Sequence, residues 1–159
     1  MNKKIIMTVA AGAALIAGAT AAISGESEER AVKARQALMQ VYAFNLGQLG
    51  AMVKGDMEYN ADLAKASADN LVKATTMNGM AMWPTGSSMA DEGMAGKTWA
   101  KADIWADGSD VGEKAKAMRE AAAQMAEVAG NGLDAVKGAM GGVGGGCKGC
   151  HEKFRAPKD

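Results

Sequence analysis

The chain is short of the side chains on which many functional sites depend. Its 159 residues include one histidine and two cysteines. These three Cys and His side chains are too few for the four ligands of a structural zinc site. A single histidine also excludes an iron held by two histidines of the same chain. Because the carboxylates are scattered and no second histidine supports an acid–base pair or a nucleophile, we expect no enzyme activity.

A long hydrophobic run is missing as well. The N-terminus carries two lysines, an apolar run over residues 5–17, and then small residues. The run is too short to span a membrane, and the pattern is typical of a secretory signal. We predict a signal peptide over residues 1–21, with an exported, soluble domain over residues 22–159.

Neither sign of charge dominates the chain. It has 18 basic and 18 acidic residues, and loss of the signal with Lys3 and Lys4 leaves 16 basic residues (18 less 2). The expected net charge near −2 argues against nucleic acid as a partner, because phosphate binding calls for a basic patch.

Residues that favour β-strands are scarce, and four segments space their apolar residues three and four apart. We therefore predict an all-α fold, an antiparallel four-helix bundle, with residues 80–108 as a long link. Arg35 is the charged exception in the first apolar stripe. The segments begin near Glu28, Asn60, Asp110 and Asn131, and end at Gly55, Gly79, Gly130 and Pro157. Tyr42, Leu46 and Met52 suit either the core or an interface.

The scarce residues gather in the stretch GGGCKGCHEKF, residues 144–154. Three residues apart on a helix, Cys147 and Cys150 share one face, and His151 follows at once. C-x-x-C-H is the attachment signature of haem c. Two thiols meet the two vinyl groups of one macrocycle as thioethers, and the imidazole of His151 is an axial ligand of the iron. We expect one covalently attached haem c.

Other uses of these residues predict different structures. A C-x-x-C pair also occurs as a structural disulfide, or as a thioredoxin-like redox pair at a strand-to-helix junction. No strand is readable around residues 147–150 to support the redox pair. The glycines before Cys147 predict either a flat group close to the backbone or a break in the helix.

The sixth position of the iron decides between functions. With no second histidine, a methionine thioether is the strongest remaining ligand type, and the predicted mature chain has 11 methionines (13 less Met1 and Met7). Most of these methionines suit the core, so methionine alone indicates little.

The whole predicted mature chain resembles the class II cytochromes c, that is cytochrome c′ and its six-coordinate, low-spin relatives. The matching stretches are CKGCHEKFR near the C-terminus, ARQALM in the first helix, MVKGDMEYNA at the first turn, and KADIW before the third helix. The resemblance implies a left-handed four-helix bundle with haem c bound between the helices.

The resemblance also assigns roles. It places Arg35 beside the haem propionates, with Gln36 joining it, and Met39 over the distal side of the iron as the sixth ligand. Arg155 matches a basic residue on the proximal side.

Three functions follow, and spectra distinguish them. The first is a periplasmic one-electron carrier with low-spin iron between His151 and Met39, serving redox partner proteins. The second is a five-coordinate cytochrome c′ that binds NO or CO at an open distal site. The third is a colourless bundle with one disulfide. We expect a monomer or a homodimer that is not membrane-embedded.

Overall fold

The computed structural model describes the backbone of residues 7–157 and the side chains of residues 25–157. Four α-helices and two 3-10 turns make up the regular structure of that part, which contains no strand beyond one isolated bridge between Ala100 and Arg155. The predicted all-α class is confirmed. The elements are α1 (Met7–Lys54), α2 (Ala61–Thr76), η1 (Met80–Met82), η2 (Ala102–Ile104), α3 (Val111–Val128) and α4 (Leu133–Phe154).

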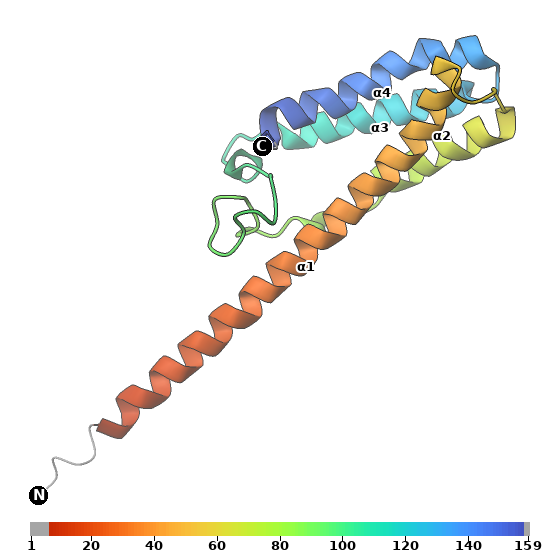
Figure 1. Ribbon diagram of the computed structural model, residues 1–159. Coiled ribbons are helices and arrows are strands. Elements are labelled where there is room, and N and C mark those ends of the chain that lie inside the picture. The colour runs from red at the N-terminus through yellow and green to blue at the C-terminus, as the bar shows by residue number, and fades with distance from the viewer. Residues whose placement is uncertain (1–6, 158–159) are drawn as a thin grey trace, which may run out of the picture.

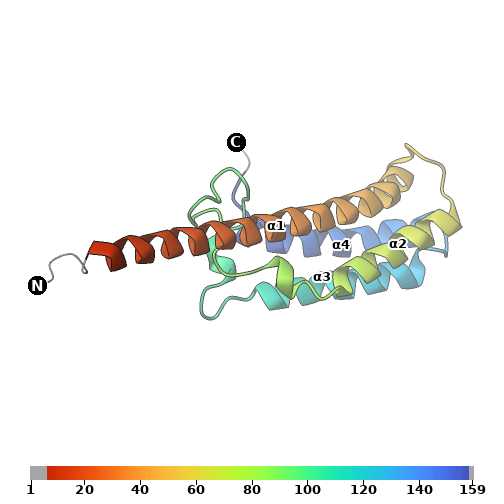
Figure 2. The ribbon, with the colours of Figure 1, turned by 90° about the horizontal axis from the view of Figure 1, so that it is seen from below.

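The helices form a bundle in which each packs against the next in the chain, and α1 also packs against α4 (Figures 1 and 2). The N-terminal half of α1 extends beyond the bundle (Figure 1). This helix begins at Met7, well before the expected start at Glu28. The alanine-rich stretch before Glu28 has a high helix propensity, which explains why the helix continues through it.

Part of the predicted signal peptide lies outside the described residues. Residues 1–6 are not described, and no side chain is described before residue 25. The cleavage site therefore stays a prediction. Among the described residues, no helix is both long and apolar enough to cross a membrane.

The core lies between all four helices at the end of the bundle away from the N-terminus. Met52, which suited either the core or an interface, is fully buried in it, and Tyr42 and Leu46 pack against it. Full burial of a large apolar side chain contributes about 1.5–3 kcal/mol. The buried members are Leu49, Met52, Ala64, Ala68, Leu71, Met118, Ala121, Ala122, Met125, Ala129, Val136 and Val143.

Tyr59 ties the α3–α4 turn to the rest of the bundle. Its Oη accepts a hydrogen bond from the backbone N–H of Gly132 and donates one to the carbonyl of Ala129, each at 2.9 Å. Gly132 has a φ of 112°, a conformation that side chains with a Cβ rarely adopt. The turn therefore depends on this glycine and on the tyrosine hydroxyl.

Residues 83–101, which we call the strap, join two distant parts of the fold. At the C-terminal end of the strap, the N–H of Lys101 donates to the carbonyl of Phe154 at 2.9 Å, and the N–H of Ala156 donates to the carbonyl of Trp99 at 2.8 Å. Both views place this loop beside α1 and the C-terminal end of α4 (Figures 1 and 2). The sequence predicted the loop but not these contacts.

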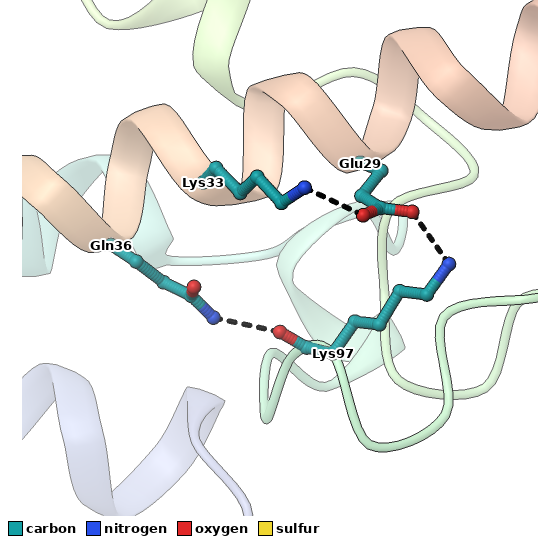
Figure 3. Close-up of polar contacts among 4 residues, drawn as sticks. All are labelled: Glu29, Lys33, Gln36 and Lys97. Carbon is teal, nitrogen blue, oxygen red and sulfur yellow. Dashed lines mark hydrogen bonds and ion pairs between the residues drawn. The ribbon is translucent and has the colours of Figure 1, made fainter.

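The strap is also ion-paired to α1 on the surface. The carboxylate of Glu29 lies 2.8 Å from Nζ of Lys33 and 2.6 Å from Nζ of Lys97, which belongs to the strap (Figure 3). Hydrogen bonds from Lys33 and Lys97 lower the pKa of Glu29 from 4.5 to about 2. The carboxylate thus stays charged, and the link stays formed, well into acid.

Replacing Tyr59 with Phe should destabilise the protein by about 1–3 kcal/mol, because the Gly132 N–H and the Ala129 carbonyl lose their partner. Tyr42→Phe is the matched control, since Tyr42 donates a single hydrogen bond, 3.1 Å long, to Ala74. Urea unfolding followed by circular dichroism measures both. Equal losses in the two variants would show that the Tyr59 bridge has no special weight.

Acid should loosen the link between the strap and α1. A carboxyl whose pKa is lowered by folding stabilises the folded state above its unfolded pKa, and that contribution disappears as pH falls through the folded pKa. The Glu29 contribution should therefore be complete above about pH 4.5 and decline towards pH 2. Stability of the wild type measured against pH should approach that of Glu29→Gln in this window, and parallel curves would contradict the assignment.

Candidate functional site

The last turns of α4 hold the three scarce side chains together. Cys147 and His151, one helical turn apart, line one open groove of about 550 Å³. Cys150 is half-buried towards the N-terminal end of α3, where Asp110 and Lys114 act on its thiol. The predicted grouping of Cys147, Cys150 and His151 on one stretch of helix is thus present. The remaining residues of the groove are Lys101, Gly144, Lys148, Glu152, Arg155, Ala156 and Pro157.

Burial keeps these groups uncharged. It raises the pKa of the Cys147 thiol, and it raises the pKa of Cys150 with help from Cys147 and Asp110. Burial also lowers the pKa of His151, and the nearby charge of Arg155 lowers it further. At neutral pH the imidazole is therefore in the unprotonated form that binds a metal.

The two thiols are not joined to each other. Both cysteines are free, which does not support the expected alternative of a structural disulfide. In the described part of the chain, no three His, Cys, Asp or Glu side chains are grouped so that they could hold a metal ion. Cys147 and Cys150 therefore remain available for a bond to another group.

The glycine-rich stretch of α4 is an unbroken helix, so of the two alternatives the break in the helix is absent. A Cβ on Gly146 would lie 3.0 Å from Cα of Met118, so this glycine lets α3 approach closely. Gly144, which lines the groove, has no atom within 4 Å of the place a Cβ would occupy. Space beside Cys147 and His151 thus stays open to a flat group, and the residues present fit a covalently attached haem.

Arg35 is buried under the strap, with 3% of its surface exposed. Nη1 donates to the Ser87 hydroxyl at 2.7 Å and to the Met82 carbonyl at 3.3 Å, while Nη2 donates to the Ser87 carbonyl and to Oγ1 of Thr98 at 3.0 Å. Burial lowers the pKa of Arg35. These hydrogen bonds explain why a charged residue is tolerated in the apolar stripe of α1. The role of Arg35 beside the haem propionates stays a prediction.

Two tryptophans complete the surroundings of Arg35. Its guanidinium carbon lies 4.5 Å from the ring centre of Trp83 and 5.9 Å from that of Trp105. These partners come from beyond the bundle helices, and no periodic pattern in the sequence indicates them. The one available signal was the unusual charge itself, which calls for a polar or aromatic partner.

Gln36 and Met39 lie on α1, apart from the groove. Nε2 of Gln36 donates to the backbone carbonyl of Lys97 at 2.7 Å, so this side chain also holds the strap (Figure 3). Met39 is half-buried, one turn after Arg35, and is not among the residues that line the groove with His151. The structure thus groups the α4 residues with one another and the α1 residues with the strap.

Arg155 lines the groove one turn beyond His151. Its backbone N–H donates to the carbonyl of His151 at 3.1 Å, which closes the last turn of α4. Its charge acts on the imidazole, as the lowered pKa of His151 shows.

Known proteins share both the sequence and the fold. The family described as cytochrome c′ matches residues 30–155. A cytochrome c′ of Cereibacter sphaeroides is 38% identical over 146 residues, which cover 92% of this chain and 96% of that protein.

Solved structures agree. The structure of cytochrome c′ from Rhodobacter spheriodes superposes with a TM-score of 0.76 at 39% identity, over 82% of this chain and 98% of that one. A nitric oxide complex of a cytochrome c prime variant from Alcaligenes xylosoxidans superposes with a TM-score of 0.70 at 27% identity, again over 82% and 98%. Together with the family match over most of its length, these likenesses make the chain a member of the cytochrome c′ family, a four-helix-bundle family whose cofactor is covalently attached haem c.

Proposed function

We propose that this protein binds a diatomic gas, NO or CO, at a haem whose iron the imidazole of His151 would ligate. The observation that carries the proposal is the groove on α4, in which His151 is the single side chain of a usual iron-ligand type besides the thiol of Cys147. Cys147 and Cys150 hold the macrocycle through two thioethers. When bound, the haem supplies an iron with one position free for a gas.

The chain's own residues prepare the site in three ways. Half-burial keeps the imidazole of His151 neutral and ready to bind iron. The bare backbone of Gly144 leaves room along α4. The nitric oxide complex of a similar protein supports NO as the ligand class.

A second function, one-electron transfer, has a specific observation in its favour. Met39 lies one helical turn after the buried Arg35 and is itself half-buried, so it belongs to the inward side of α1. A thioether from Met39 on the iron would close the gas site and raise the reduction potential. This arrangement is the low-spin carrier expected from the sequence.

The proposal places the protein in the periplasm. The predicted signal over residues 1–21 directs export, and covalent attachment prevents loss of the cofactor after export. Redox proteins of that compartment would then supply or accept electrons.

Attachment should need both thiols. The exported wild type should carry one haem that survives denaturing electrophoresis, whereas the double variant of Cys147→Ser with Cys150→Ser should release its haem to acidic solvent. Gly149→Ala is the matched control, because its Cβ would meet Lys114 at an ordinary 4.0 Å and both thiols remain. Mass spectrometry and haem staining report the outcome. Covalent haem in the double variant would refute the assignment of these thiols.

The Met39→Leu variant separates gas binding from electron transfer. If the distal side is open, the reduced wild type should show a broad high-spin spectrum that shifts with CO, and Met39→Leu should change it little. Met77→Leu, at a 56% exposed position, is the control. Sharp low-spin bands that ignore CO in the wild type, and that become CO-sensitive in Met39→Leu, would overturn gas binding in favour of the His151 and Met39 carrier.

A further inference from the structure

We infer that Arg35 is a positioning residue: through the strap it sets how closely α1 approaches the C-terminal end of α4, and so how much room a gas has opposite His151. The inference rests on the proposed function, because it concerns the same site. In this inference the strap connects Arg35 on α1 to the end of α4 that carries His151.

The first step is the attachment of the strap to α1. Both terminal nitrogens of Arg35 donate two hydrogen bonds each, and every acceptor is neutral and belongs to Met82, Ser87 or Thr98. With no terminal N–H left over, the guanidinium is committed to the strap and the residue before it. Because the site is buried and its acceptors carry no charge, salt and moderate pH changes should leave this attachment in place.

The second step runs from Thr98 to His151. Oγ1 of Thr98 accepts from Nη2 of Arg35 at 3.0 Å and from the backbone N–H of Ala100 at 3.2 Å. Trp99 and Lys101 lie on either side of Ala100. They are hydrogen-bonded to Ala156 and to Phe154, the last residue of α4, which follows His151 by three residues. One hydroxyl thus joins the guanidinium on α1 to the backbone segment that pairs with the end of α4.

The third step concerns what holds α1 near α4 at the His151 end of the bundle. Among the described side chains of α1, those that belong to the main core or pack against it begin at Tyr42 and include Leu49 and Met52. Towards the N-terminus, Val32 and Arg35 are buried but lie outside that core cluster, at the level of the strap. At the His151 end, the strap is hydrogen-bonded both to α1, through Arg35 and Gln36, and to the end of α4, so it links the two helices there.

Met39 lies between these two regions of α1, four residues after Arg35. A small outward movement of α1 at the strap would carry the Met39 side chain with it. The strap would then determine the clearance on the distal side without contributing an atom to the site.

The test uses variants that leave Arg35, Met39 and His151 intact. Thr98→Val keeps the shape and removes the shared hydroxyl, while Lys65→Gln removes only an exposed ion pair with Asp69 within α2 and is the matched control. Two quantities are measured in the haem-loaded protein. One is the rate of CO association, and the other is amide hydrogen exchange in residues 28–40 and 46–54 of α1.

We expect Thr98→Val to raise exchange in residues 28–40 but not in 46–54, and to speed CO association about tenfold, the change that corresponds to one lost hydrogen bond of about 1.4 kcal/mol. Lys65→Gln should change neither quantity. If residues 28–40 exchange faster but CO association is unchanged, or if neither changes, the inference fails while the proposed function stands.

The proposed function can fail by a separate result. A wild type that takes up no CO would refute gas binding and, with it, the role of the strap in gas access. Exchange in the two α1 segments would still decide whether Arg35 holds α1 to the strap. Circular dichroism of each variant excludes loss of the fold as the cause.

Discussion

The period of the α-helix is the constraint on which the site depends. Residues four apart lie one above the other on a helix face, so Cys147 and His151 must face the same groove wherever α4 is packed. Cys150, three residues from Cys147, is not among the groove residues and is half-buried near Asp110 and Lys114 at the start of α3. Two further features hold that stretch of helix in position: Gly146 lets α3 come close, and the strap is hydrogen-bonded to Phe154 and Ala156.

Much of this architecture could be predicted from the sequence, because amphipathic helices space their apolar residues three and four apart. The cap at Asn60 is present, with its side chain accepting from the N–H of Leu63, and the helices end close to the predicted glycines. The predicted start of α1 was wrong because it was placed where the amphipathic pattern begins. Alanine favours a helix even where no amphipathic pattern is present, so α1 begins earlier. The C-x-x-C-H stretch was readable because its chemistry fits within five residues.

The surroundings of Arg35 were not readable for the opposite reason. Its hydrogen-bond partners are 47 to 63 residues away in the chain, in a loop whose conformation no period describes. The sequence could show that a buried arginine needs partners, but not that Ser87, Thr98 and two tryptophans supply them. Roles taken from family resemblance, such as those of Arg35, Gln36 and Met39 towards the haem, remain predictions.

The glycine content of α4 has a consequence for how the protein matures. Seven of its 22 residues are glycine, and each lowers helix stability by about 0.5–1 kcal/mol relative to alanine. Such a segment has little tendency to form a helix in isolation, and packing against α3 should stabilise it. Before α3 packs against it, the two thiols would lie on a flexible peptide and would be accessible for haem attachment. Folding of the bundle would then bury the thioether bonds.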